Sequence, residues 1–278
     1  MTQTVLITGC STGFGEATAR LFAARGWNVV ATMRRPAMGT ALAALDNVLV
    51  ARLDVQDSAS IDVAIADGIN RFGRIDMLIN NAGFGLFGIF EATAQERVRE
   101  QFDVNVFGLM DVTRSILPHF RVNRAGVIVN ISSGAGVFTL PMISLYCASK
   151  FALEGFSEAL SYELASLGIT VKIVEPGGVT STEFGRRSGE EAALGQRLTD
   201  YDPFVKGAVA VFDGLRASRA NATSEEVAEV IFNAATDGTD QLRYVATDDI
   251  KPLVAARRES SESEYLAFMR QRVTPRIN

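Results

Sequence analysis

The chain has 278 residues, enough for one large domain or two small ones, and 47% of them are hydrophobic. With 27 Lys and Arg against 32 Asp and Glu, the formal net charge of −5 argues against a nucleic-acid or anionic-membrane surface. Two cysteines and one histidine provide neither a disulfide framework nor a metal-ligand pattern. No apolar run approaches the roughly 18 residues that span a bilayer. We therefore expect a reduced, cytoplasmic protein without metal, nucleic-acid partner or membrane attachment.

The first 83 residues alternate short β-branched runs with longer helical patterns. The expected strands are 4–8, 29–32, 48–53 and 77–81, and the expected helices are 16–24 and 58–72. This alternation predicts a parallel, doubly wound α/β sheet of Rossmann type, with helices on both faces. Ligands of such sheets bind beyond the carboxyl ends of the strands.

A glycine-rich turn joins the first strand to the first helix. It reads T-G-x-x-x-G-x-G from Thr8 to Gly15, which departs from the G-x-G-x-x-G fingerprint. Glycines let the backbone approach a pyrophosphate, and the N-terminus of the next helix supplies amide donors. We expect a dinucleotide to be bound here by Gly9, Ser11, Thr12, Gly13, Phe14 and Gly15.

The end of the second strand bears on the choice of cofactor. Dinucleotide folds that prefer NAD carry an acidic residue about 20 residues past the glycine loop. Met33 takes that place here, and Arg34 and Arg35 follow it. A guanidinium can bind a 2′-phosphate through two hydrogen bonds. The sequence thus predicts NADP rather than NAD, unless the two arginines are only solvated charges at a strand end.

The segment 126–150 contains a candidate proton-transfer site. Its opening β-branched run predicts a buried strand that ends at Ser133, and a helical segment carrying Tyr146 and Lys150 follows. The last two residues are four apart, so they share one face of a helix. The Tyr-x-x-x-Lys pattern is weak alone, but Ser133 can add a hydroxyl. We expect Lys150 to lower the pKa of the phenol, which would let Tyr146 act as acid or base.

This arrangement resembles the catalytic segment of the short-chain dehydrogenase/reductase family. The glycine-rich turn resembles the family's cofactor loop, and the resemblance runs in order to about Ala246. It implies that Ser133 holds a substrate carbonyl oxygen and that Tyr146 exchanges a proton with it. Lys150 would bind the ribose hydroxyls. Asn105, expected within a helical stretch from 94 to 121, matches the family's asparagine that holds a water of the proton relay.

The resemblance also implies further cofactor contacts. Asp54, followed by Val55, would hold the adenine amino group, and the N-N-A-G motif ending in Asn81, Ala82 and Gly83 would line the adenosine side. The pattern P-G-x-V-x-T holds the nicotinamide carboxamide in the family, and it maps onto Pro176, Gly177, Val179 and Ser181. Serine replaces the usual threonine, with Thr180 and Thr182 beside it. Which of the three hydroxyls contacts the nicotinamide stays open.

The C-terminal third is less regular. The expected catalytic helix runs to about 167, and a strand at 171–174, a helix from 223 or 224 to 235 and a last strand at 242–246 follow. We expect one catalytic domain (1–247) with a substrate lid at about 182–222, and an extension (248–278). The extension carries an apolar stripe that would pack on the lid or on a neighbouring subunit: Tyr265, Leu266, Phe268 and Met269.

The sequence around Glu175 and the long lid look most like the retinol and hydroxysteroid dehydrogenase branch of the family. The pocket candidates are apolar or aromatic: Val137, Phe138, Phe184 and Tyr201. We expect an NADP-dependent oxidoreductase that interconverts a bulky hydrophobic ketone or aldehyde and its alcohol, assembled as a homodimer or homotetramer. The alternatives are epimerising or other non-redox chemistry with retained cofactor, and a non-catalytic NADP sensor. The intact Ser133, Tyr146 and Lys150 argue against the sensor.

Overall fold

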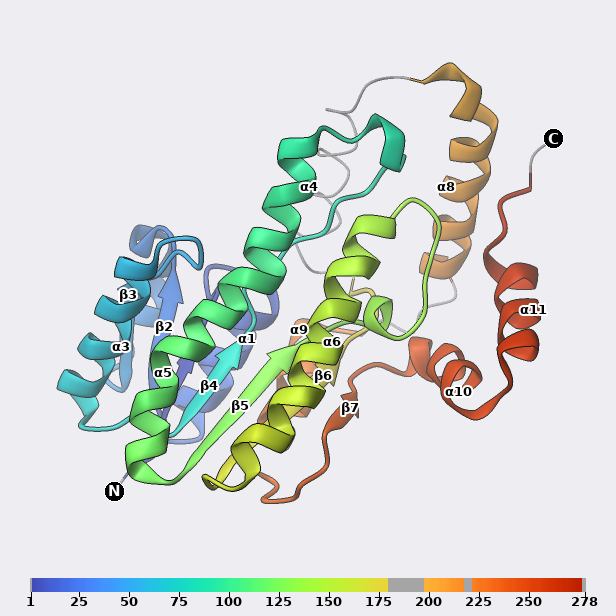
Figure 1. Cartoon of the computed structure of the whole chain (residues 1–278). Helices are drawn as coiled ribbons and strands as arrows, with labels where there is room; N and C mark the ends of the chain where they lie inside the picture. Colours follow the sequence, from blue (N-terminus) through green and yellow to red (C-terminus); the bar gives the residue numbers. More distant parts are fainter. Residues whose placement is uncertain (1, 180–197, 218–221, 277–278) are drawn as a thin grey trace.

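The computed structural model describes residues 2–179, 198–217 and 222–276, and a parallel β-sheet lies at its centre (Figure 1). The strands are β1 (Thr4–Ile7), β2 (Asn28–Met33), β3 (Val48–Arg52), β4 (Met77–Asn80), β5 (Gly126–Ile131), β6 (Ile169–Glu175) and β7 (Arg243–Val245). The sheet has seven strands in the order β3-β2-β1-β4-β5-β6-β7, and all neighbours are parallel. The order reverses between β1 and β4, where such sheets bind dinucleotides.

Helices cover both faces of the sheet (Figure 1). The helices α1 (Gly13–Ala24) and α9 (Ser224–Thr236) share one apolar core with one face of the strands. The second core lies under α3 (Ser58–Phe72), α5 (Leu109–Asn123) and α6 (Ser144–Ala165). Neighbouring residues of β1 enter opposite cores, because side chains alternate along a strand. Burial on both faces explains the continuous apolar runs of the strands. The expected doubly wound α/β fold is confirmed.

The helical stretch expected from 94 to 121 is interrupted. It consists of α4 (Gln95–Phe102), a π-helical turn (Asp103–Gly108) and α5. A Cβ on Gly108 would lie 2.7 Å from two side-chain atoms of Val55, so glycine permits the close approach of this turn to the end of β3. The helix is therefore widened at the turn that contains Asn105.

The C-terminal third is more helical than its sequence pattern suggests. It contains the helices α8 (Asp202–Ala217), α10 (Lys251–Glu259) and α11 (Glu262–Val273). A further short helix, α2 (Thr40–Ala43), lies near the N-terminus. Within the segment 182–222, where the sequence predicts a substrate lid, residues 202–217 form α8. From the extension's stripe, Tyr265 and Met269 are buried in a third core with Val137 and Phe138, whereas Leu266 is 37% exposed. These buried residues pack on the loop that follows β5.

Within the described residues, no helix combines the length and the apolar character that crossing a membrane requires. The described residues also contain no group of three or more His, Cys, Asp or Glu side chains that could hold a metal ion.

A buried charge fastens the edge of the sheet. Lys172 of β6 is 2% exposed, and its ammonium contacts Asp237, just past α9, and the Tyr244 hydroxyl of β7 at 2.9 Å. The Tyr244 hydroxyl donates to the second carboxylate oxygen of Asp237 at 2.5 Å. Burial favours the protonated acid, but the hydrogen bonds from Lys172 and Tyr244 hold the pKa of Asp237 well below its usual range. The network ties β6, β7 and the end of α9 together.

We predict that Asp237→Asn lowers the free energy of unfolding by about 3 kcal/mol, because it leaves the buried Lys172 ammonium without its counter-ion. Chemical denaturation with both variants measures the loss. Asp240→Asn is the matched control: this carboxylate lies in the same connection but is exposed, and its removal should change stability by less than about 0.5 kcal/mol. Equal stability of the two variants would contradict the assignment.

Candidate active site

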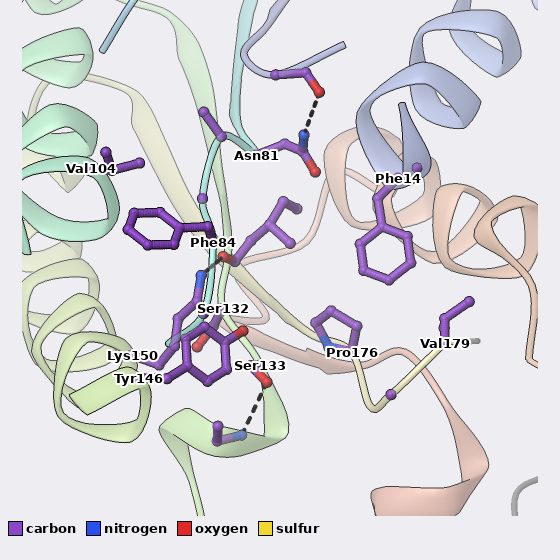
Figure 2. Close-up of a pocket in the computed structure, with 18 of the residues that line it drawn as sticks. Phe14, Asn81, Phe84, Val104, Ser132, Ser133, Tyr146, Lys150, Pro176 and Val179 are labelled. Carbon is purple, nitrogen blue, oxygen red and sulfur yellow. Dashed lines mark hydrogen bonds between the residues drawn. The ribbon is translucent and has the colours of Figure 1, made fainter. Parts of the chain in front are cut away.

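A cavity of about 890 Å³ lies at the carboxyl ends of the strands. Its wall includes the loops that follow β1, β2, β3, β4, β5 and β6, and it reaches residues of α8 and α10. Tyr146, Lys150 and Ser133 come together on one side, and Phe14 and Val179 lie across from them (Figure 2). The predicted position beyond the strand ends is confirmed.

The glycine-rich turn forms one end of the cavity. Gly9 has φ +74° and Gly13 has φ +60°, a backbone region that favours glycine. Ser11, Thr12, Gly13 and Phe14 also line the cavity, and α1 begins at Gly13. The Thr12 side chain does not cap this helix, so the amide groups of the first turn remain available to an anion.

Asn81 braces this turn from the end of β4. Its side-chain amide donates to the carbonyl oxygens of Thr8 and Gly9, at 2.9 and 3.2 Å. In return, the Thr8 hydroxyl accepts from the backbone amides of Asn81 and Ala82 at 3.0 Å each. The N-N-A-G motif therefore has two roles: its last three residues line the cavity, and Asn81 fixes the shape of the cofactor loop.

Another part of the cavity contains residues that the sequence predicts to contact the adenosine. Arg34, Asp54 and Val55 line it, together with Met33, whose side chain is buried. Asp54 accepts from the backbone amide of Gln56 at 3.1 Å, which orders the turn after β3. Arg34 is exposed at the end of β2, where a ligand can recruit its guanidinium.

The proton-transfer residues meet where α6 passes the end of β5. The Ser133 side chain accepts from the backbone amide of Ala135 at 3.1 Å and is hydrogen-bonded to the Tyr146 phenol. The Lys150 ammonium donates to the carbonyl oxygen of Ile131 at 2.8 Å and lies 5.8 Å from the centre of the Tyr146 ring. The structure thus brings the three predicted residues together (Figure 2).

Burial dominates the acid–base behaviour of this group. It raises the pKa of Tyr146 to about 12, and the hydrogen bond with Ser133 opposes only part of the rise. It also lowers the pKa of Lys150 to about 8, against the opposing charge of Glu154. The expected net lowering of the phenol's pKa is therefore not found, because burial outweighs any stabilisation of the phenolate by Lys150. The ammonium is bound to a carbonyl on the neighbouring strand, and burial disfavours the phenolate.

Asn105 lies in the π-helical turn, and its side-chain amide makes three hydrogen bonds within the protein. Its amide oxygen accepts from the backbone of Phe84 at 3.0 Å, and its amide nitrogen donates to the Phe84 carbonyl at 2.8 Å and to the Ser149 hydroxyl at 3.1 Å. It is 1% exposed and is not among the described residues that line the cavity. The side chain is thus committed to contacts within the protein, and the expected role of Asn105 in a proton relay stays a prediction. Asn105 holds the loop after β4 against α6.

The remainder of the cavity is mostly apolar. Phe87 and Phe212 meet there edge to face, with ring centres 5.0 Å apart. The predicted Phe138 belongs to this part, and the wall also contains Phe84, Leu86, Leu140, Ile143, Leu215, Ile250 and Leu253. Sequence reasoning missed most of these residues, because they come from loops, from α8 and from the C-terminal extension, where no motif marks them.

Several predicted site residues lie elsewhere. Val137 is buried in the core against the extension, and Tyr201 belongs to a second cavity of about 420 Å³, where its hydroxyl donates to Glu91 at 2.9 Å. Among the described residues that line the main cavity, neither Gly15 nor Arg35 occurs. Ser181 and Phe184 lie outside the described residues.

Pro176, Gly177 and Val179 line the cavity as expected, and the extension supports their loop. The backbone amide of Gly177 donates to the Thr247 hydroxyl at 2.9 Å, and this hydroxyl donates to Asp249 at 2.5 Å. The residues that the family uses for the nicotinamide are thus fastened to the segment between β7 and α10.

Gly15 has a packing role that can be tested. A Cβ there would lie 2.3 Å from the Gly9 carbonyl oxygen and 2.5 Å from the Asn81 side-chain nitrogen. We expect Gly15→Ala to displace the cofactor turn, to cost about 1–3 kcal/mol of stability and to weaken NADPH binding at least about tenfold. Denaturation and a fluorescence titration with NADPH measure both effects. In the control Gly214→Ala, the new Cβ meets nothing within 4 Å, so cofactor affinity should not change.

A family model described as short chain dehydrogenase matches residues 3–193. An uncharacterized oxidoreductase of Schizosaccharomyces pombe is 39% identical over 242 residues, which cover 87% of this chain and 99% of that protein. The 17-beta-hydroxysteroid dehydrogenase type 1 of Mus musculus is 35% identical over 281 residues, which cover 96% of this chain and 80% of that protein. A short-chain dehydrogenase structure from Streptomyces avermitilis has a TM-score of 0.81 at 34% identity, covering 98% of this chain and 97% of that chain.

Solved neighbours hold both forms of the nicotinamide cofactor. The structure of ElxO with NADP bound has a TM-score of 0.72 at 25% identity and covers 88% of this chain and 98% of that chain. A 3-ketoacyl-(acyl-carrier-protein) reductase from Brucella melitensis complexed with NADH has a TM-score of 0.74 at 26% identity and covers 88% and 97%. Sequence, fold and the Ser133–Tyr146–Lys150 group agree: the chain belongs to the short-chain dehydrogenase/reductase family, nicotinamide-dependent oxidoreductases that act on CH–OH and C=O groups.

Proposed function

We propose that the chain is an NADP(H)-dependent oxidoreductase that interconverts a bulky hydrophobic ketone or aldehyde and its alcohol. The observation that carries the proposal is the position of the Ser133–Tyr146 pair in the wall of a single cavity. One end of this cavity is a glycine-rich turn, and another part is walled by aromatic and aliphatic side chains.

The residues present fit a nicotinamide dinucleotide. The turn at Gly9 approaches the loop after β4 so closely that a Cβ would lie 3.0 Å from the Ala82 backbone, and the uncapped start of α1 lines the same space. A pyrophosphate would be held there, the adenosine near Asp54 and the nicotinamide near Pro176. When bound, the cofactor supplies or accepts the hydride.

The protein's own residues manage the proton. Tyr146 is protonated at neutral pH, because burial raises its pKa to about 12, and it can donate to a substrate carbonyl oxygen in the reduction direction. Ser133 is placed to hydrogen-bond the same oxygen. Lys150 would bind the ribose hydroxyls, and its positive charge would stabilise the phenolate left after proton transfer. Asn105 would act indirectly, by holding the loop that carries Phe84.

The apolar part of the cavity supports a hydrophobic substrate. Phe87 and Phe212 form an aromatic pair there, and Ile250 and Leu253 close the wall from the extension. Similarity to 17-beta-hydroxysteroid dehydrogenase type 1 points to steroid-like ketones as the first compounds to try. We favour reductase chemistry over epimerising chemistry, because the relatives described above are oxidoreductases.

We also propose that the chain forms a homodimer or homotetramer. Three large side chains on the helical layer of α5 and α6 remain exposed: Phe107 at 55%, Phe151 at 40% and Tyr162 at 74%. Apolar side chains grouped on one layer favour contact with a second copy.

The proton-donor role predicts a specific loss of activity. Tyr146→Phe removes the hydroxyl but keeps the ring, so turnover with a panel of aromatic and steroidal ketones should fall about 10²–10⁴-fold while NADPH binding persists. Tyr162→Phe, on the exposed face of the same helix, is the control and should keep full activity. Turnover is followed by the absorbance of the reduced cofactor. Near-normal turnover of Tyr146→Phe would contradict the mechanism.

The cofactor preference rests on Arg34. A charged hydrogen bond contributes about 1.5–3 kcal/mol, so NADPH should be preferred over NADH by about ten- to a hundredfold in kcat/KM. Arg34→Ala should remove most of this preference and hardly change NADH kinetics. Arg35→Ala is the matched control, since this neighbour lies outside the cavity. Equal use of NADH and NADPH by the wild-type enzyme would contradict the assignment.

A further inference from the structure

Glu154 is a buried acid behind the proposed site, and no step above uses it. It follows Lys150 by one helical turn on α6, so the two side chains share a face, and both are buried, at 7% and 6% exposed. Gly136 makes room for it: a Cβ there would lie 3.0 Å from Glu154 Cγ and 2.7 Å from the Ser132 hydroxyl. Glu154 thus packs behind the loop that presents the catalytic serine.

The Glu154 carboxylate belongs to a network of acidic and basic side chains. Arg243 of β7 donates to Glu154 at 3.0 Å and to Glu158 at 2.5 Å, and it lies 3.7 Å from Glu175. Glu175, at the end of β6, is 0% exposed and binds Arg258 of α10 at 2.5 Å. Charges therefore alternate from Lys150 on α6 to the C-terminal extension.

We propose that Glu154 is a positioning residue that keeps the ammonium of Lys150 protonated inside the protein. A buried ammonium loses its solvation, and an opposite charge one helical turn away on the same buried face favours the charged form. The inference rests on the proposed function only where it concerns catalysis, because the charge state of Lys150 can be measured without a substrate.

The acid–base behaviour supports this arrangement. Burial lowers the pKa of Lys150 to about 8, and Glu154 is the neighbour that opposes the fall. Burial raises the pKa of Glu154 itself, and the Ser132 hydroxyl and Arg243 oppose that rise. The ionisable groups around the pair are Tyr146 and Glu158 on α6, Glu175 on β6, Arg243 on β7 and Arg258 on α10.

Removal of the Glu154 charge should lower the pKa of Lys150. Without the Glu154 charge the pKa of Lys150 falls further below about 8, so the ammonium is lost at lower pH. The alkaline limb of the kcat/KM profile for ketone reduction should therefore move down by about one pH unit or more in Glu154→Gln. Tyr146, with a pKa of about 12, titrates too late to produce this limb.

A direct measurement uses the scarcity of lysine, since the chain has only four: 150, 172, 206 and 251. Protein labelled with ¹³C at the lysine ε-carbon gives four signals whose shifts follow the charge of each amine, and Lys150→Arg assigns the relevant one. We expect the Lys150 titration to move to lower pH in Glu154→Gln. Glu158→Gln is the matched control. It removes the other carboxylate on α6 that binds Arg243, but this side chain is 43% exposed and should leave Lys150 unchanged.

The two readouts separate the possible outcomes. A shifted lysine signal without any ketone reduction supports the inference and contradicts the proposed function. A uniform loss of activity with an unshifted lysine titration means that Glu154 is only structural, and it overturns the inference. If Glu154→Gln does not fold, Glu154→Asp replaces it: the carboxylate moves by one methylene, so a smaller shift in the same direction is expected, and an unchanged Lys150 titration overturns the inference.

Discussion

The hydrogen bond from Lys150 to the carbonyl oxygen of Ile131 is the contact on which the site depends. It joins α6 to the last residue of β5, so the helix face that carries Tyr146 stands beside Ser133, which follows the strand. The bond is buried, and a buried ammonium without partners would be costly. The helix therefore cannot slide or rotate along the strand without leaving that charge unpaired, and the spacing of the three side chains follows.

A second set of hydrogen bonds fixes the end of the cavity that the glycine-rich turn forms. Asn81, just past β4, holds the shape of the glycine-rich turn through hydrogen bonds to the carbonyl oxygens of Thr8 and Gly9. Because β1 and β4 are adjacent where the strand order reverses, these hydrogen bonds lie at the crevice where a dinucleotide fits. Both ends of the cavity are thus fixed to the same rigid sheet, and preorganisation of this kind lowers the reorganisation that catalysis requires.

The C-terminal extension is part of the site. Ile250 and Leu253 form part of the cavity wall, Asp249 binds the Thr247 hydroxyl that holds the loop at Gly177, and Arg258 binds the buried Glu175. Through Arg243 and Glu154, the same charges reach the helix of Lys150. The apolar wall of the cavity and the environment of Lys150 therefore share supports, so changes in the extension can affect both.

Local pattern in the sequence determined the α/β fold, the strand positions, the glycine turn and the serine, tyrosine and lysine of the site, because period, turn chemistry and spacing depend on neighbours in the chain. Only the tertiary structure decided what depends on distant partners. Burial raises the pKa of Tyr146, and the Asn105 side chain is hydrogen-bonded to the backbone of Phe84. Val137 packs under the extension instead of lining the cavity. Desolvation and the walls of a cavity arise from residues that meet only in three dimensions, so no local pattern encodes them.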